Sequence, residues 1–193
     1  MVGSTCARHI PQADDGSENV ARARQAITMN DATSRIISYY LEKKSLMTAI
    51  EVKKAKTGLK ACVYYGEFNI LPDFSELKPV IIKTVPGISH TVAGRDSLFS
   101  IVFEGYLLIP ADGVYGLYVN SDDGSKMIID ETDPVVNDGI HGMREEGRNY
   151  PLAKGYHKLR IEYFQRVGGM GLEFLVEAPG QQKKIVTPNM LFN

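Results

Sequence analysis

The sequence predicts an all-β protein: an antiparallel, jelly-roll-like β-sandwich of two sheets, preceded by a small partial β module. Two observations support this fold class. From about residue 58 onward, apolar side chains alternate with polar ones in short runs, as they do in strands that bury one face in a core. Turns rich in glycine and proline separate these runs, and the chain has 18 glycines and 9 prolines. Short strands broken by such turns are typical of sandwiches and barrels.

The strand-like runs differ in how many of their faces are apolar. In the clearest run, Leu159, Ile161 and Tyr163 alternate with charged residues, so only one face is apolar. Residues 97–109 are apolar nearly throughout, which predicts a central strand with both faces buried. The connection 131–149 is predicted to be a loop, of a length that is usually functional or mobile. Strands with one apolar face are predicted at 114–119, 157–163 and 172–177.

Residues 1–57 have a different pattern, and we predict a partial module and linker there, before a separate domain at 58–193. Residues 22–29 have helical propensity. Residues 53–58 are charged and poor in apolar side chains, which predicts a linker. A unit of about 55 residues buries little surface by itself, so we expect it to pack on its neighbour. Two runs in this part have the composition of strands, 34–40 and 47–52.

The charge of the chain is nearly balanced, with 22 Lys and Arg against 23 Asp and Glu in 193 residues. Without a basic surplus, binding of nucleic acid through phosphate neutralisation is not expected. No apolar run approaches the roughly 20 residues that cross a bilayer, so no membrane span is expected. The first residues lack the apolar core of a signal peptide. A fragment of a longer secreted chain would look the same.

The two cysteines, Cys6 and Cys62, lie in no CxxC pair or Cys/His cluster. A structural zinc site needs about four ligands, so zinc is not expected. Cys62 lies in the strand-like run 59–65, where we expect a small buried thiol; a disulfide with Cys6 is the alternative. No nucleophile–base pair and no known catalytic motif is visible, which predicts a non-catalytic chain.

Several motifs occur in an order that matches a known family. The segment 112–130 reads Asp-Gly-Val-Tyr-Gly-Leu-Tyr-Val-Asn-Ser-Asp-Asp-Gly-Ser-Lys-Met-Ile-Ile-Asp, the loop 137–142 reads Asn-Asp-Gly-Ile-His-Gly, and 152–164 contains Leu-x-x-Gly-x-His. Over about residues 58–190, this set resembles the protective antigen fourteen-kilodalton domain, a β-sandwich named for the anthrax toxin component and found in bacterial glycosidases and fungal adhesins. Comparable residues of that family correspond to 73–74, 103–106 and 171–174.

The first part of the chain resembles the small fibronectin-like module at the C-terminal end of chitobiases and β-N-acetylhexosaminidases. It has Asn19 where that module usually has proline, and Gln12 where it usually has tyrosine. The matching segments are 15–18, 26–28, 33–40 and 44–45.

The two resemblances imply a non-catalytic, carbohydrate-binding accessory domain. They imply that it forms the C-terminal part of a secreted or periplasmic bacterial glycoside hydrolase, with a glycan and the parent's catalytic domain as partners. An alternative is a structural module that packs on the catalytic domain or shapes its substrate cleft without binding sugar. A stand-alone hydrolase is a further alternative. The resemblance, and not the composition, carries these functional expectations.

The resemblance also implies a site at Asp122 and Asp123. In the adhesin branch of the family, adjacent aspartates joined by a cis peptide hold a calcium ion that binds sugar hydroxyls, and Asp122 and Asp123 match those positions. Carboxylates are ligands that calcium prefers. The adhesins add an asparagine and carbonyls from a late loop. Here that loop, residues 165–170, has no acidic ligand or asparagine, and Arg166 would bring a positive charge near a metal. The alternative is that both aspartates cap backbone amides in a tight turn.

Loops at one end of a sandwich gather, so we expect the candidate residues to converge. The resemblance places the strands that start at Val114 and His157 side by side. His157 itself is expected to be a buried core histidine, whereas His141 could bind a sugar or tie a neighbouring aspartate into a network. The candidate carbohydrate-binding residues are Asp122, Asp123, Asn137, Asp138, His141 and Arg166. Because tryptophan is absent, the loop-proximal aromatic candidates are Tyr150 and Tyr156.

Overall fold

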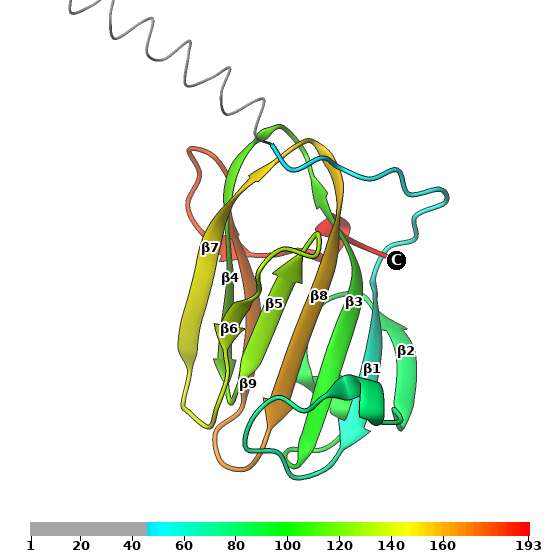
Figure 1. Cartoon of the computed structure of the whole chain (residues 1–193), viewed down its shortest axis with the longest axis vertical. Coiled ribbons are helices and arrows are strands. Elements are labelled where there is room, and N and C mark those ends of the chain that lie inside the picture. The colour runs from blue at the N-terminus through cyan, green and yellow to red at the C-terminus, as the bar shows by residue number, and fades with distance from the viewer. Residues whose placement is uncertain (1–45) are drawn as a thin grey trace, which may run out of the picture. The chain divides into compact units, whose positions relative to one another are not determined.

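The computed structural model describes residues 46–193, and this part of the chain is a β-sandwich (Figure 1). Helix is confined to three single turns, η1 (Phe74–Glu76), η2 (His90–Ala93) and η3 (Pro188–Met190). Among the described residues, no helix is long and apolar enough to cross a membrane. The strands are β1 (Leu59–Tyr65), β2 (Ile81–Val85), β3 (Phe99–Ile109), β4 (Gly113–Asp122), β5 (Ser125–Ile129), β6 (Val135–Asn137), β7 (Arg144–Leu152), β8 (Gly155–Gln165), β9 (Gly171–Glu177), β10 (Lys184–Ile185) and β11 (Leu191–Phe192).

The strands form two sheets, and within each sheet every pair of neighbouring strands is antiparallel. The seven-stranded sheet has the order β2-β1-β3-β8-β5-β6, with β11 also paired to β3. The four-stranded sheet has the order β10-β9-β4-β7. The predicted fold class, an antiparallel two-sheet sandwich, is confirmed.

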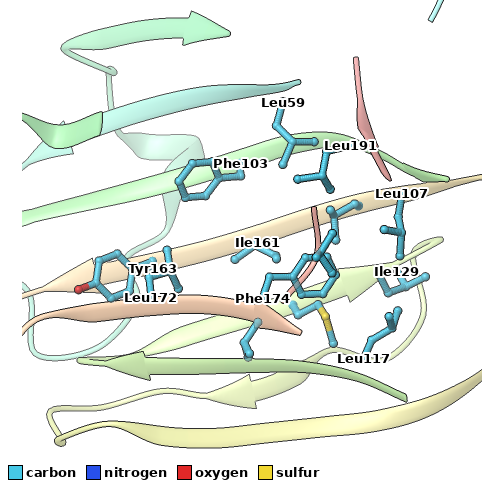
Figure 2. Packing of buried hydrophobic residues seen from close by; sticks show 14 of the residues in the cluster. Leu59, Phe103, Leu107, Leu117, Ile129, Ile161, Tyr163, Leu172, Phe174 and Leu191 are labelled. Carbon is cyan, nitrogen blue, oxygen red and sulfur yellow. The ribbon is translucent and has the colours of Figure 1, made fainter. Parts of the chain in front are cut away.

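The core lies between the two sheets, where side chains from both inner faces meet (Figure 2). Leu159, Ile161 and Tyr163 of β8 are at most 2% exposed, as their alternation predicted. Leu117 of β4 and Phe174 of β9 pack against them from the other sheet. Burial of this apolar surface is the main force that holds the sheets together.

Strand β3 is central, as its apolar sequence predicted, because β1 and β8 flank it on either side. The prediction that both of its faces are buried is wrong for part of its length, because Glu104, Tyr106 and Leu108 are only partly buried. The outer face is covered near one end only. There Val102 packs with Cys62 and Tyr64, and the connection after β1 contributes Phe74 and Leu77. Cys62 is therefore buried in a small second cluster, as predicted.

The predicted loop 131–149 is wrong, because it contains β6 and most of β7. Strand β7 pairs with β4 at the edge of the four-stranded sheet. Residues 144–149 of β7 are exposed, so they carry no apolar alternation that could have indicated a strand. Polar edge strands of this kind resist pairing with other chains.

Residues 46–57 run along the sandwich without forming the predicted strand at 47–52. Met47 and Ile50 make isolated bridges to Leu152 and Tyr156, and Thr57 in the predicted linker bridges Phe192. These contacts add no new strand, because they are too short to build a ladder. The division at residue 57 stays a prediction. The predicted helix 22–29, the predicted strand 34–40, Cys6 and the fibronectin-like motifs lie outside the described residues.

Candidate functional site

The candidate residues gather around residues 121–125, which we call the double-aspartate turn. Strand β4 of the four-stranded sheet ends at Asp122, and β5 of the seven-stranded sheet begins at Ser125, so the turn carries the chain from one sheet to the other. The peptide bond between Asp122 and Asp123 is cis. The Ser121 and Ser125 hydroxyl oxygens, both buried, lie 2.7 Å apart in a hydrogen bond. The turn is thus tied to the core.

Asp123 is 2% exposed and joins the turn to two loops. Its Oδ1 accepts a hydrogen bond from the His141 backbone amide at 3.2 Å, and its Oδ2 accepts one from the Arg166 backbone amide at 2.9 Å. The loop between β6 and β7 and the late loop therefore meet at one carboxylate, at the lower end of the sandwich in Figure 1. Asp123 caps backbone amides, which is the alternative that the sequence left open for it.

The strands β4 and β8 are not neighbours, contrary to what the resemblance implied, because they lie in different sheets. The late loop still reaches the double-aspartate turn for a different reason. Strand β5 leaves the turn and pairs antiparallel with β8, so β8 runs toward the turn and ends beside it. The Phe164 amide donates to the Gly124 carbonyl at 2.9 Å, which fixes this approach.

Asn137 lies beneath the turn and is fully buried. Its Nδ2 donates to the Ser121 hydroxyl at 3.1 Å and to the Arg144 carbonyl at 2.8 Å. Its Oδ1 accepts a hydrogen bond from the Arg144 Nε at 2.6 Å. The polar atoms of this amide are already used, so the structure gives Asn137 a role in holding the loop rather than an exposed contact surface.

Asp138 and His141 stabilise the same loop from its outer side. The Asp138 Oδ1 accepts hydrogen bonds from the Leu71 amide at 2.9 Å and the Gly139 amide at 2.7 Å. The two His141 ring nitrogens lie 3.0 Å from the Asn137 carbonyl oxygen and 2.8 Å from the Gly142 carbonyl oxygen. The His141 ring therefore contacts backbone carbonyls, whereas the His141 backbone amide donates to Asp123.

Arg166 uses its backbone and its side chain in different directions. Its amide binds Asp123, while its guanidinium pairs with Glu67 at 2.9 Å. Sequence reasoning missed two contacts from the connection after β1, that of Glu67 with Arg166 and that of Leu71 with Asp138. Each joins residues more than 60 positions apart, and nothing in the local sequence of this connection indicates it.

Asp122 differs from its neighbour, because its carboxylate receives no hydrogen bond from the described residues. The side chain is partly exposed. Burial raises the pKa of Asp122, the adjacent Asp123 carboxylate raises it further, and His141 opposes both. The backbone of the late loop passes close by: a Cβ atom on Gly169 would lie 2.5 Å from the Asp122 Oδ2.

Exposed apolar side chains lie in the two loops that meet at this end of the sandwich. Ile140 and Met143 from the loop between β6 and β7 are each 50% exposed, and Val167 from the late loop is 59% exposed. Met143 lies over Gly171, which pairs with Asp122 across β4 and β9. The end of the sandwich thus presents one unpaired carboxylate among exposed carbon surfaces.

The residues present do not fit the calcium site that the resemblance implied. Calcium takes six to eight oxygen ligands. No group of three or more acidic, histidine or cysteine side chains suited to a metal exists within residues 46–193. Both oxygens of Asp123 accept amide hydrogen bonds, and the late loop adds no carboxylate or asparagine side chain.

The aromatic candidates are wrong for this end of the molecule. Tyr150 is 2% exposed and belongs to the core, and Tyr156 lies at the opposite end of β8, against Tyr106 and Phe192. His157 is a buried core histidine, as predicted. Its Nδ1 lies 2.5 Å from the Asp130 Oδ2 and its Nε2 lies 2.8 Å from the Ala153 carbonyl.

A family model described as the PA14 domain matches residues 55–188. Two solved structures of similar fold are the Epithelial Adhesin 6 A domain of Candida glabrata, in complex with Galb1-3GlcNAc, and a PA14 sugar-binding domain from an RTX adhesin. The first has a TM-score of 0.60 and 11% identity, covering 74% of this chain and 89% of that chain. The second has a TM-score of 0.57 and 16% identity, covering 71% and 98%. These likenesses support the fold.

Two further proteins are similar over part of their length. A beta-hexosaminidase of Porphyromonas gingivalis is 23% identical over 184 residues, which cover 87% of this chain and 23% of the enzyme. An anti-sigma factor domain-containing protein has a TM-score of 0.58 and 21% identity, covering 70% of this chain and 48% of that chain. The chain thus spans about a quarter of the first protein and about half of the second.

Proposed function

Because the chain belongs to the PA14 domain family over residues 55–188, we propose that it is a non-catalytic carbohydrate-binding domain that serves a glycoside hydrolase outside the cytoplasm. One observation carries the proposal: the partly exposed carboxylate of Asp122 receives no hydrogen bond from the described residues, whereas Asp123 beside it is fully engaged. The sugar complex of the adhesin relative and the sugar-binding title of the other support a glycan as the ligand.

The chemistry around Asp122 suits a sugar. An ionised carboxylate accepts hydrogen bonds only, and its two oxygens can receive hydroxyls on neighbouring carbons of one sugar ring. Hydrogen bonds to a charged acceptor are about twice as strong as neutral ones. Ile140, Met143 and Val167 offer carbon surface for the apolar face of the ring. Binding in this mode needs no metal.

Catalysis is not part of the proposal. Glycoside hydrolysis uses two carboxyl groups about 5–10 Å apart on either side of the scissile bond. At this end of the sandwich, Asp123 and Asp138 accept backbone hydrogen bonds that hold loops, and Glu67 pairs with Arg166, so these three carboxylates are already engaged. The hexosaminidase relative supports β-linked hexosamine glycans as the first ligands to test and a catalytic domain as partner.

A glycan array tests the proposal with the whole chain and the Asp122→Asn variant, which keeps the shape of the side chain and removes its charge. We expect binding of glycans that end in hexose or N-acetylhexosamine, and a loss of about tenfold or more in the variant. Glu177→Gln, an exposed carboxylate of β9 that accepts from Tyr118, is the matched control. Unchanged binding by Asp122→Asn would contradict the proposal.

A structural module remains the second candidate, because exposed apolar residues near Asp122 also suit a protein contact. In that case Ile140, Met143 and Val167 would pack against a catalytic domain. No binding across the array, together with a shift in the sedimentation of a hexosaminidase catalytic domain mixed with the chain, would support this candidate over the first.

A further inference from the structure

A groove crosses the outer face of the seven-stranded sheet, which is the face turned away from the core. Its volume is about 660 Å³, within the range of ordinary ligand sites. Strands β1, β3, β8 and β5, which lie side by side in Figure 1, form its floor. We call it the sheet-face groove. The residues of β8 that line the groove are 158–160, toward the start of the strand. The double-aspartate turn lies beside the other end of β8, at Gln165.

The floor of the groove is a straight row of side chains across four strands. Lys60 pairs in register with Glu104, Glu104 with Arg160, and Arg160 with Ile128. Neighbouring strands lie about 4.8 Å apart, so three steps span about 14 Å. This length exceeds one sugar unit and suits a short chain of them.

The charges in the groove cancel. Glu104 pairs with both Lys60 and Arg160, and Lys158 pairs with Glu131. Counting every charged lining residue, three basic side chains face three acidic ones, the last being Asp130. A lining without net charge gives no long-range attraction to a polyanion or a polycation. It does offer alternating donors and acceptors, which match a ligand that carries many hydroxyl groups.

The groove also offers carbon surface. The half-buried Tyr106 of β3 and Ile128 of β5 both line it, and the methylene stems of the lysines and Arg160 lie along its floor. Tyr106 is held in place by edge contact with Tyr156, whose ring centroid lies 6.4 Å away. At the other end of β3, Phe74 and Leu77 cover the sheet, so the open part ends there.

We propose that the sheet-face groove binds a neutral oligosaccharide of more than one sugar unit. Hydroxyl groups of the ligand donate to Glu104 and Glu131 and accept from Lys158 and Arg160, while Tyr106 packs against a sugar ring. The groove is a second site and goes beyond the function proposed above, because it uses neither Asp122 nor the loops around it.

Calorimetric titration of the whole chain with chitotriose and with cellotriose tests this proposal. We expect Tyr106→Ala and Lys158→Ala each to weaken binding of at least one of these trisaccharides about tenfold, the loss expected for one contact to a charged or aromatic group. Lys183→Ala, a partly exposed lysine between β9 and β10 that pairs with Glu145, is the control and should bind as the wild type does. Asp122→Asn should keep the groove-dependent binding.

The possible results separate the two sites. Binding that is lost in Asp122→Asn and kept in both groove variants overturns the groove proposal and leaves the proposed function intact. No binding of either trisaccharide, or tighter binding of a heparin-derived oligosaccharide than of both, also overturns it. If Tyr106→Ala fails to fold, Lys158→Ala decides, since Lys158 is an exposed side chain whose charged partner, Glu131, is exposed as well.

Discussion

At the double-aspartate turn, the Asp123 carboxylate is held by backbone amides from two loops, whereas in the sheet-face groove Lys60, Glu104 and Arg160 hold one another through their side chains. A buried charge bound by the backbone fixes where loops go, and removing it leaves donors without partners. Exposed charges that pair with each other can exchange partners with water or with a ligand. The first arrangement fixes the geometry of the turn, and the second leaves side chains that can still contact a ligand.

The largest effect should come from breaking the backbone-held charge. We expect Asp123→Ala to lower the free energy of unfolding by about 2–4 kcal/mol, because two amides lose a charged acceptor. Asp122→Ala should cost much less, since its carboxylate accepts no hydrogen bond from the described residues and its pKa is already raised. Urea denaturation of the two variants measures the difference. Equal losses would show that both aspartates hold the turn.

The His157–Asp130 pair, at the opposite end of β8, should give an intermediate effect that depends on pH. Burial lowers the pKa of His157, but hydrogen bonds to Asp130 and Ala153 outweigh it, so the pKa is raised. A raised folded-state pKa gives stability that is complete below the unfolded pKa of about 6.5 and is lost as pH rises through the folded pKa.

Asp130→Asn removes the charged partner and keeps a residue that tolerates the positive φ of 45° at this position. Its deficit in unfolding free energy relative to the wild type should be about 1–2 kcal/mol at pH 5.5 and smaller at pH 8.5. Thermal or urea unfolding at both pH values measures the deficit. The same deficit at both pH values would mean that Asp130 does not raise the pKa of His157 in the folded protein.

The smallest effect should come from the exposed pair in the groove. Lys60 and Glu104 lie 3.6 Å apart, and both side chains are more than 40% exposed. We expect Lys60→Ala to change the free energy of unfolding by about 0.5 kcal/mol or less, as for other surface ion pairs. A larger loss in the same urea assay would mean that the groove's charges hold the sheet together, and would remove the contrast with the turn.

Much of the fold could be predicted from the sequence, because a strand with one buried face repeats every two residues. Leu159, Ile161 and Tyr163 gave that signal, and so did the continuous apolar run that became β3. Strand β7 gave none, because both faces of its first six residues are exposed. Tyr150 was misjudged for the same reason, since it follows that polar stretch and yet enters the core.

The meeting of the loops at the candidate site could be predicted, whereas the contacts of its residues could not. The motif around Asp122 and Asp123 indicated the turn, and strand connectivity indicated that loops would meet there. The partners of each carboxylate could not be predicted, because the Arg166–Glu67 pair joins residues 99 positions apart. The sequence also gives no local signal that β4 and β8 belong to different sheets, because sheet membership depends on which strands pair.

The position of β3 between β1 and β8 has a consequence for the speed of folding. Strand β3 begins 34 residues after the end of β1 and ends 46 residues before the start of β8, so both of its main ladders join distant parts of the chain. Closing such loops costs entropy before the contacts are made. Proteins dominated by distant strand pairings fold in roughly milliseconds to seconds. We therefore expect slow folding, during which the apolar edges of β3 are exposed to aggregation.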